Sequence, residues 1–257
     1  MKKMVLKYPG AKWRIADWIL PKMPKHHSYV EPYFGSGALF FCKPPSKIET
    51  INDLDNDVVN LFQCIRNNSE QLCAVISATP FARQEYDNAF LLEAEDPIEK
   101  ARIFLIKCWQ GHGFRTNAYK AGWKNDVQGR EAAYAMRNWY RLPGWIMDTV
   151  ERLKEVQIEN RPAVEVIKRF NFENVLIYAD PPYVLSTRTG KKYKHEMTDV
   201  DHVELLETLL HHKGPVMLSG YDNEMYASCL KGWDKYQIAT TAEKGLHRTE
   251  TLWIKGA

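Results

Sequence analysis

The sequence contains few cysteines and no grouping of them that would hold a metal. The five cysteines are scattered along the chain: Cys42, Cys64, Cys73, Cys108 and Cys229. Their number is odd and no pair has Cys-x-x-Cys spacing, so neither a disulfide framework nor a zinc cluster is indicated. The pairs His26-His27 and His211-His212 have no further ligand residues beside them. We predict no metal site and a reducing, cytoplasmic location.

Long apolar runs are also missing. No run approaches the roughly 20 residues that a membrane-spanning helix needs, and the basic N-terminal segment MKKMVLKYPGAKW lacks the apolar stretch of a signal peptide. Apolar residues make up 45% and charged residues 26% of the chain, a composition typical of a folded globular protein rather than a disordered one. The 257 residues allow one or two domains and an enclosed small-molecule site.

The chain has little excess charge of either sign: its net charge is only +3. Basic residues nevertheless concentrate between positions 115 and 141, where six of them stand against Asp126 and Glu131 and give a local charge of +4. The six are Arg115, Lys120, Lys124, Arg130, Arg137 and Arg141. A basic segment in a nearly neutral protein is typical of a surface that contacts phosphate, and a merely solvated surface is the alternative.

Hydrophobic patterns predict strands that alternate with helices in the first 66 residues and again after residue 155. The expected strands are 28–31, 48–52, 156–159, 175–179, 216–219, 235–240 and 251–254. The expected helices are 12–20, a helix that follows the glycines of 34–37, 56–66, 162–170 and 201–212. The alternation predicts an α/β fold with a doubly wound, mostly parallel, Rossmann-like sheet. Helical patterns dominate residues 70–150, which predicts an inserted, mainly helical subdomain.

The clearest motif is Asp180-Pro181-Pro182-Tyr183, directly after the apolar run 175–179. Ligands of open α/β sheets bind beyond the carboxyl ends of the strands, where this motif lies. Two consecutive prolines make the loop rigid and remove two donors, so the loop presents the Asp180 carboxylate and main-chain carbonyls as acceptors. Acceptors beside the flat ring of Tyr183 suit a planar ring that carries an amino group. An ordinary proline-rich turn is the alternative.

A glycine-rich segment, EPYFGSG (31–37), follows the first expected strand. Its two glycines allow a tight turn and a close approach of a ligand to the main chain. The segment lacks the third glycine of the dinucleotide fingerprint and the lysine of a P-loop, so neither a dinucleotide nor a nucleoside triphosphate is well supported. A plain strand-to-helix turn is the alternative.

Two shorter segments add polar groups. Asp53 lies in NDLD (52–55), at the end of the second expected strand, where a carboxylate can accept from ribose hydroxyls or an ammonium group. Capping of the following helix is the alternative. The segment KYPGAK (7–12) precedes the first helix, where its aromatic, glycine and lysine residues could hold an anionic or carboxylate-bearing ligand. A flexible basic terminus is the alternative.

Taken in this order, the four segments resemble the Dam-type (D12 class) DNA adenine-N6 methyltransferases over roughly residues 5–66 and 155–257. The tail segments HEM (195–197), LSGY (218–221) and RTETLW (248–253) are similar to the phage and prophage branch of that family. The resemblance implies a catalytic domain of residues 1–66 and 151–257 that binds S-adenosylmethionine. It also implies that residues 67–150 form an inserted target-recognition subdomain that binds DNA.

The resemblance further implies the roles of single residues. Cofactor contacts are implied for Tyr8, Lys12, Glu31, Phe34, Gly35, Gly37, Asp53 and Asp180. The catalytic motif would be Asp180, Pro181, Pro182 and Tyr183. Its acceptors would bind the amino hydrogens of an adenine that is flipped out of the duplex, and Tyr183 would stack on the base. The implied reaction moves a methyl group from S-adenosylmethionine to adenine N6 and leaves S-adenosylhomocysteine.

The implied partner is double-stranded DNA. The residues expected to contact it are Lys7, Arg115, Asn117, Lys120, Lys124, Lys191 and Lys192. Arginine and asparagine are residue types that read guanine and adenine edges, but the sequence does not specify the target site. A cognate restriction endonuclease is a candidate partner. A monomer is expected, with a dimer as the alternative.

Three other functions share parts of this pattern. Cytosine-N4 methylation uses the same amino-group chemistry, although a serine commonly replaces the first acid of the motif. Methylation of RNA or of protein glutamine uses Asn/Asp-Pro-Pro-Tyr motifs, usually without a long insertion. A catalytically silent DNA-binding protein of this fold would have a broken cofactor site, and the sequence shows none.

Overall fold

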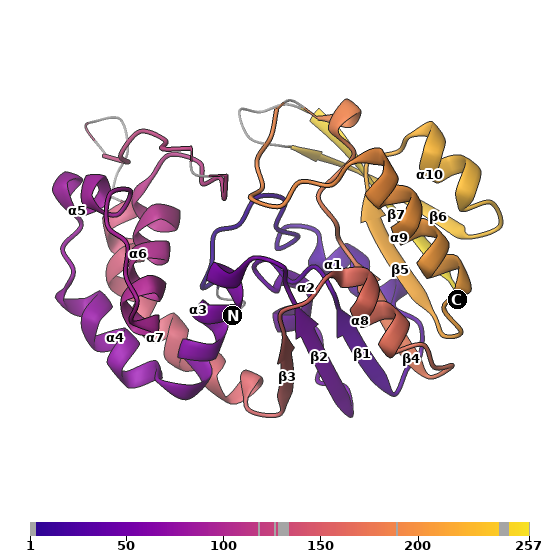
Figure 1. The fold of residues 1–257 in the computed structure, drawn as a ribbon, viewed down its shortest axis with the longest axis horizontal. Coiled ribbons are helices and arrows are strands. Elements are labelled where there is room, and N and C mark those ends of the chain that lie inside the picture. The colour runs from indigo at the N-terminus through magenta and orange to yellow at the C-terminus, as the bar shows by residue number, and fades with distance from the viewer. Residues whose placement is uncertain are drawn as a thin grey trace.

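A computed structural model describes residues 4–117, 119–125, 127, 134–188, 190–241 and 247–256 (Figure 1). In that part of the chain, seven strands form one sheet in the order β3-β2-β1-β4-β5-β7-β6. The strands are β1 (Ser28–Glu31), β2 (Ile48–Asn52), β3 (Val156–Glu159), β4 (Val175–Ala179), β5 (Val216–Gly220), β6 (Asp234–Thr241) and β7 (His247–Lys255). The first five are parallel to one another, whereas β7 runs antiparallel to β5 and β6. The predicted doubly wound, mostly parallel sheet is confirmed.

Helices of two groups accompany the sheet. Those nearest to it are α1 (Ala16–Ile19) with the 3₁₀ turn η1 (Leu20–Lys22), α2 (Ala38–Cys42), α8 (Ala163–Arg169), α9 (Asp199–His211) and α10 (Glu224–Cys229), and the 3₁₀ turn η2 (Leu185–Thr187) follows β4. The second group is α3 (Asn56–Asn67), α4 (Ser69–Ala78), α5 (Arg83–Asn88), α6 (Pro97–Gln110) and α7 (Tyr134–Leu153). Figure 1 shows this second group to the left of the sheet. No described helix is both long and apolar enough to cross a membrane.

The central strands are buried on both faces, which is why their sequences are nearly continuous apolar runs. Every residue of β4 and β5 is buried. The strand β1 lies between β2 and β4, with Val30 beside Thr50 on one side and Ile177 on the other. The chain leaves β1 toward β2 on one side and reaches β4 on the other, so a topological switch point lies between β1 and β4. Ligands of such sheets bind in the crevice that this reversal creates.

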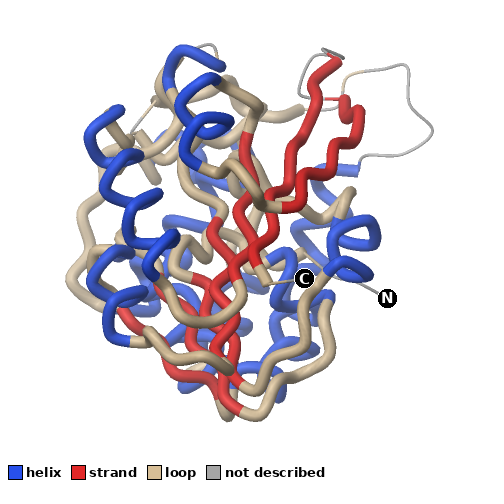
Figure 2. The backbone as a smooth tube through the Cα atoms, turned by 90° about the vertical axis from the view of Figure 1, so that its right-hand side faces the viewer, coloured by secondary structure: helices blue, strands red, loops and turns tan. Residues whose placement is uncertain are grey.

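Helices lie on both sides of the strands (Figure 2), and apolar side chains pack on both faces of the sheet. On one face, α8, α9 and α10 pack over residues such as Val30, Ile177 and Leu218. On the other face, α1, α2 and the N-terminal segment pack over Tyr29 and Leu176. The sheet is therefore enclosed by helices on both faces, as the alternating pattern predicts.

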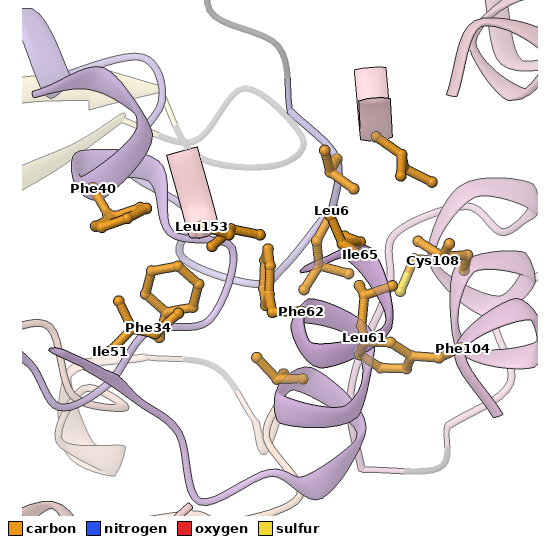
Figure 3. Close-up of a cluster of buried hydrophobic side chains, with 14 of the residues drawn as sticks. Leu6, Phe34, Phe40, Ile51, Leu61, Phe62, Ile65, Phe104, Cys108 and Leu153 are labelled. Carbon is orange, nitrogen blue, oxygen red and sulfur yellow. The ribbon is translucent and has the colours of Figure 1, made fainter. Parts of the chain in front are cut away.

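The core of the second face continues into the helices α3 to α7. Figure 3 shows Phe34 from the glycine turn close to Phe62 of α3, whose neighbour Leu61 lies beside Phe104 of α6. The ring centroids of Phe34 and Phe62 are 4.8 Å apart. Because α3 also packs against α6 and α7, it joins the sheet to the helices that follow it. The division into a domain of residues 1–66 and 151–257 and an insertion at 67–150 stays a prediction.

Two tryptophans of the helical segment are core residues. Trp109 and Trp139 are each 1% exposed, and their indole groups donate to the carbonyls of Val5 at 2.9 Å and Thr79 at 2.8 Å. Buried indole N–H groups usually find such partners. These side chains therefore stabilise the fold and are not available to stack on bases.

The structure corrects some element boundaries. The helix predicted for 12–20 begins only at Ala16, because Lys12 is drawn into the site described below and residues before Ala16 form turns. The short helix α10 was not predicted. It has only six residues, too few to show a helical period, and it is fixed by Asn223, whose side chain accepts from the Tyr226 N–H at 3.0 Å.

Candidate functional site

A cavity of about 770 Å³ lies beyond the carboxyl ends of β1, β2 and β4, at the switch point. Eight of the residues predicted from the sequence line it, namely Tyr8, Lys12, Glu31, Phe34, Gly35, Asp53, Asp180 and Pro182. Gly37, Pro181 and Tyr183 do not line this cavity but stand directly beside residues that do. The four motifs, far apart in the sequence, thus meet at one place.

The glycine turn brings the main chain close to two aromatic rings. Gly35 has φ +48° and a Cβ there would lie 2.8 Å from the ring of Tyr8. Gly37, with φ +63°, immediately precedes α2, and a Cβ there would lie 2.4 Å from the ring of Phe34. Only glycine accommodates both the left-handed conformation and the close approach. The turn therefore packs Tyr8 and Phe34 against the main chain in the cavity wall.

The acidic segment after β2 holds this turn in place. The Asp53 carboxylate accepts from the Gly35 N–H at 2.7 Å and from the Asp55 N–H at 2.9 Å. Burial raises the pKa of Asp53 to about 6, against the effect of these hydrogen bonds. Asp55 caps α3 through one carboxylate oxygen, and its other oxygen is buried without a hydrogen-bond partner in the described residues. This end of β2 therefore keeps acceptor capacity for a ligand.

An ion pair stands between the first and last motifs. The Lys12 ammonium lies 2.8 Å from each carboxylate oxygen of Asp180 and donates to the Gly10 carbonyl at 2.7 Å. Lys12 is only 5% exposed. Burial lowers the pKa of Lys12, but the neighbouring carboxylates outweigh it and raise that pKa above its ordinary value. Burial also raises the pKa of Asp180, and Lys12 opposes this shift. The pair fixes the acceptor at the start of the two-proline loop.

Glu31, the last residue of β1, is a second buried acid in this wall. It is 2% exposed and accepts from the Tyr29 hydroxyl at 2.6 Å. Its pKa is raised to about 8, mainly by burial and also by the nearby Asp180, although the Tyr29 hydrogen bond opposes the shift. Carboxyl groups outnumber lysines among the lining side chains. Acids together with flat apolar walls fit a cofactor that carries positive charges, ribose hydroxyls and an aromatic base.

Tyr183 lies beside Lys12, which lines the cavity. The Lys12 ammonium is 4.9 Å from the centroid of its ring, and its hydroxyl donates to Glu250 of β7. Its ring meets the edge of Tyr221, with centroids 4.6 Å apart and planes at 68°. Tyr183 is therefore positioned by Glu250 of β7 and by Tyr221, which directly follows β5.

Residues 190–197, which we call the strap, run past the cavity after the catalytic motif. Five of them, 193–197, line it. Glu196 accepts from the main-chain N–H groups of Lys192 at 2.6 Å and Tyr193 at 3.0 Å, and it pairs with Arg188. Arg188 in turn donates to the Tyr183 carbonyl at 2.7 Å. The strap is thereby connected to the loop of residues 180–183, the predicted catalytic motif.

The strap also joins the two segments expected to contact DNA. Lys192 accepts through its carbonyl from the Thr116 N–H at 2.9 Å, and Asn117 donates to the Lys191 carbonyl at 3.0 Å. Thr116 accepts from the Lys194 N–H at 2.7 Å. The structure therefore places Asn117, Lys191 and Lys192 side by side at one edge of the cavity, although 74 residues separate Asn117 from Lys191.

Other residues predicted for DNA contact have protein partners. Lys120 pairs with Asp87 at 2.7 Å, and the Arg115 guanidinium lies 4.4 Å from the ring centroid of Tyr119. The Lys7 ammonium lies 3.9 Å from the Trp109 ring centroid, and burial, with Lys124 nearby, lowers its pKa to about 8. The main-chain N–H of Lys124 donates to the Gln110 carbonyl at 2.7 Å.

Other residues of the predicted basic segments either fall outside the described residues or pair with acids of the protein. Arg130, Asp126 and Glu131 of the basic segment fall outside the described residues. Lys194, a further basic residue after the catalytic motif, pairs with Asp55 at 3.4 Å and Asp57 at 3.3 Å. Within the described ranges, no group of three or more His, Cys, Asp and Glu side chains is arranged to hold a metal ion.

Sequence reasoning missed Tyr193, Tyr221 and Glu250. Tyr193 donates to the Pro9 carbonyl at 3.2 Å and lies near Tyr8, with ring centroids 6.1 Å apart. For Glu250, the strand pattern could have predicted burial. Side chains of a strand alternate, so along β7 Glu250 shares a face with the buried Leu252 and Ile254. An acid on the apolar face of a strand requires a buried partner.

Comparisons with known proteins agree with this geometry. A family model described as D12 class N6 adenine-specific DNA methyltransferase matches residues 8–244. The type II methyltransferase M1.LlaDCHI of Lactococcus lactis subsp. cremoris is 25% identical over 266 residues, which cover 93% of this chain and 88% of that protein. The DNA adenine methylase of Salmonella typhi is 23% identical over 248 residues, with 91% of this chain and 84% of that protein covered.

The DNA adenine methylase of Escherichia coli (strain K12) is 21% identical over 229 residues, which cover 84% of this chain and 80% of that protein. The family match begins at Tyr8 and extends beyond the catalytic motif, so it includes the residues that meet at the cavity. The chain therefore belongs to the D12 class N6 adenine-specific DNA methyltransferases, enzymes that take the methyl group from S-adenosylmethionine.

Proposed function

We propose that the cavity holds S-adenosylmethionine and that the Asp180-to-Tyr183 loop presents to it an adenine flipped out of duplex DNA. The observation that carries this proposal is the convergence of Lys12, Asp180 and Tyr183 at the rim of the cavity. A buried acid, fixed by a lysine and adjacent to an aromatic ring, suits a base that carries an amino group.

The cavity wall supplies partners for each part of the cofactor. Asp53 offers a carboxylate to ribose hydroxyls at the end of β2, the position that does so in doubly wound folds. Glu31 and the glycine turn stand at the end of β1, where an ammonium group would find an acid and the main chain would allow close approach. Tyr8 and Phe34 provide flat apolar walls. When bound, S-adenosylmethionine supplies an activated methyl group, so the residues of the chain need only place the acceptor.

The loop after β4 places that acceptor. The amino nitrogen of adenine is a poor nucleophile, because its lone pair is delocalised into the ring. The Asp180 carboxylate and the Pro181 carbonyl can accept its two hydrogens and favour a pyramidal nitrogen. Asp180 is also the acceptor for the proton that the nitrogen loses. Stacking on Tyr183 contributes about 1–3 kcal/mol toward the few kcal/mol that flipping costs. Placement then supplies most of the rate acceleration.

We propose that the strap and residues 115–124 form the edge that receives DNA. Asn117 and the lysines at 191 and 192 lie together there, and residues of these types contact base edges and phosphate. The four motifs of a single chain assemble the cavity, so the proposed reaction needs no residue of a second copy, and we further propose that the enzyme acts as a monomer. Its substrate would be duplex DNA in the cytoplasm of a bacterial cell. One relative, from Lactococcus lactis, is a type II methyltransferase, which supports a search for a cognate restriction endonuclease.

The decisive experiment is transfer of labelled methyl from S-adenosylmethionine to plasmid DNA prepared from a host that lacks adenine methylation. Mass spectrometry of the hydrolysed DNA should show N6-methyladenine with the wild-type protein and none with Asp180→Ala. Label on cytosine N4, on RNA or on protein would refute the proposal. Sequencing of the modified plasmid would then give the recognition site.

A further inference from the structure

Glu250 is a buried acid for which the family motifs and the proposed mechanism give no role. It lies on β7, opposite Ile238 of β6, and only 6% of it is exposed. A carboxyl group is almost never buried to this extent without partners that hold it. Its partners are two residues of the transfer site, Tyr183 and Lys12.

The contact with Tyr183 fixes an aromatic ring. Tyr183 follows two prolines, and its hydroxyl donates to the Glu250 carboxylate. The edge contact with Tyr221 restricts the same ring from a second direction. A tyrosine ring held only by its own rotamer preference could swing, whereas a ring held at its hydroxyl and packed against a second ring keeps one orientation. Glu250 therefore fixes the plane on which a base would stack.

The contact between Glu250 and Lys12 places a second negative charge beside the lysine ammonium. The ammonium lies 2.8 Å from both oxygens of Asp180 and 3.6 Å from Glu250. One lysine thus faces two carboxyl groups inside a buried cluster. With Lys12 bound to both of its oxygens, Asp180 has one lone pair of each oxygen already engaged, and an adenine amino group must use those that remain. A second carboxylate within reach of the same ammonium lets Lys12 shift away from one oxygen of Asp180 without becoming an unpaired buried charge.

We infer that Glu250 is a positioning residue of the methyl-transfer site: it orients Tyr183 through the hydroxyl and shares Lys12 with Asp180, so that Asp180 can accept from the adenine amino group. The inference rests on the proposed function, since it assigns that amino group to Asp180. It assigns Glu250 no contact with the base or with the cofactor.

The test is a single-turnover assay on the full-length protein, with labelled S-adenosylmethionine and plasmid DNA that lacks adenine methylation. Glu250→Gln removes the charge that Lys12 needs but keeps an oxygen for Tyr183. We expect the transfer rate to fall by roughly 10- to 100-fold, as expected of a misplaced acceptor. The affinities for S-adenosylmethionine and for DNA, measured separately, should change by less than about twofold. The matched control is Glu155→Gln, which makes the same chemical change at an exposed turn before β3 and should leave the rate unchanged.

A double-mutant cycle separates positioning from a merely structural role. If Glu250 acts through the Tyr183 hydroxyl, Tyr183→Phe should slow transfer in the wild-type background and have a much smaller effect in a Glu250→Leu background, where that hydroxyl has lost its acceptor. Two independent losses would instead multiply to within about twofold. A normal rate for Glu250→Gln, or losses that multiply, would overturn the inference.

A second pair of variants covers the case in which Glu250→Gln does not fold. Glu250→Asp keeps the negative charge but shortens the side chain. It should therefore still balance the charge of Lys12 but lose the hydrogen bond from the Tyr183 hydroxyl. Tyr183→Phe should then slow transfer in the wild-type protein but not in Glu250→Asp, and equal effects in both backgrounds would overturn the inference. Failure of the wild-type protein to methylate adenine would refute the proposed function itself, which is a distinct result.

Discussion

Glu31 should make the stability of the free protein depend on pH in a defined direction. Burial raises its pKa from the ordinary value of 4.5 to about 8, so the folded state holds a proton in this range that the unfolded state has already released. The unfolded state therefore binds fewer protons, and the free energy of unfolding must fall as pH rises. The free energy of unfolding falls by about 1.4 kcal/mol for each pH unit. Between the two pKa values of Glu31, the loss amounts to roughly 5 kcal/mol.

The variant Glu31→Gln isolates this contribution. Glutamine keeps an oxygen for the Tyr29 hydroxyl but does not titrate, and Asp53, Asp180 and Glu250 are present in both proteins. We expect the difference in unfolding free energy between the variant and the wild type to grow with pH from about 4.5 to about 8 and then to level off. Urea unfolding, followed by tryptophan fluorescence at several pH values, measures it. A difference that is flat across this window would show that Glu31 is ionised in the folded protein and would refute the reasoning.

Four further outcomes test other parts of the site. Asp180→Ala should lower the single-turnover rate by about 100-fold or more, because it removes the placed acceptor, while thermal melting shows a folded protein; near-normal rates would contradict this. Asp53→Ala should weaken S-adenosylmethionine binding by about 1.5–3 kcal/mol in calorimetry, and unchanged affinity would remove Asp53 from the site. Gly37→Ala should lower the unfolding free energy by at least about 1 kcal/mol, because φ is +63° and the new methyl group would meet Phe34; an unchanged urea midpoint would argue against the turn. If about five phosphates are neutralised, the logarithm of DNA affinity should fall against the logarithm of salt concentration with a slope near −4.5, and Lys120→Glu with Lys124→Glu should flatten it. Because Lys120 already pairs with Asp87, most of that change should come from Lys124, and a wild-type slope near zero would rule out this surface.

The sheet was predictable because its signals are local. The run VLIYA and the pattern of strands alternating with helices depend on neighbouring residues, and they predict β4 and a mostly parallel sheet. The ends of elements were less predictable where side chains serve the site, as at Lys12, which ends up in an ion pair and not in a helix. The helix α10 was too short to show a period.

The motifs predicted which residues belong to the site, but not which of them touch. Lys12 and Asp180 are 168 positions apart, and nothing in either segment specifies that one ammonium binds both oxygens of the carboxylate. The same holds for Tyr183 and Glu250, and for Asn117 and the strap. Each contact depends on where two separate elements end after the sheet has formed, and therefore on long-range packing. Burial is the property that connects the two levels: an acid such as Glu250, placed by strand alternation among buried apolar residues, must find a partner, although only the fold determines that this partner is Tyr183.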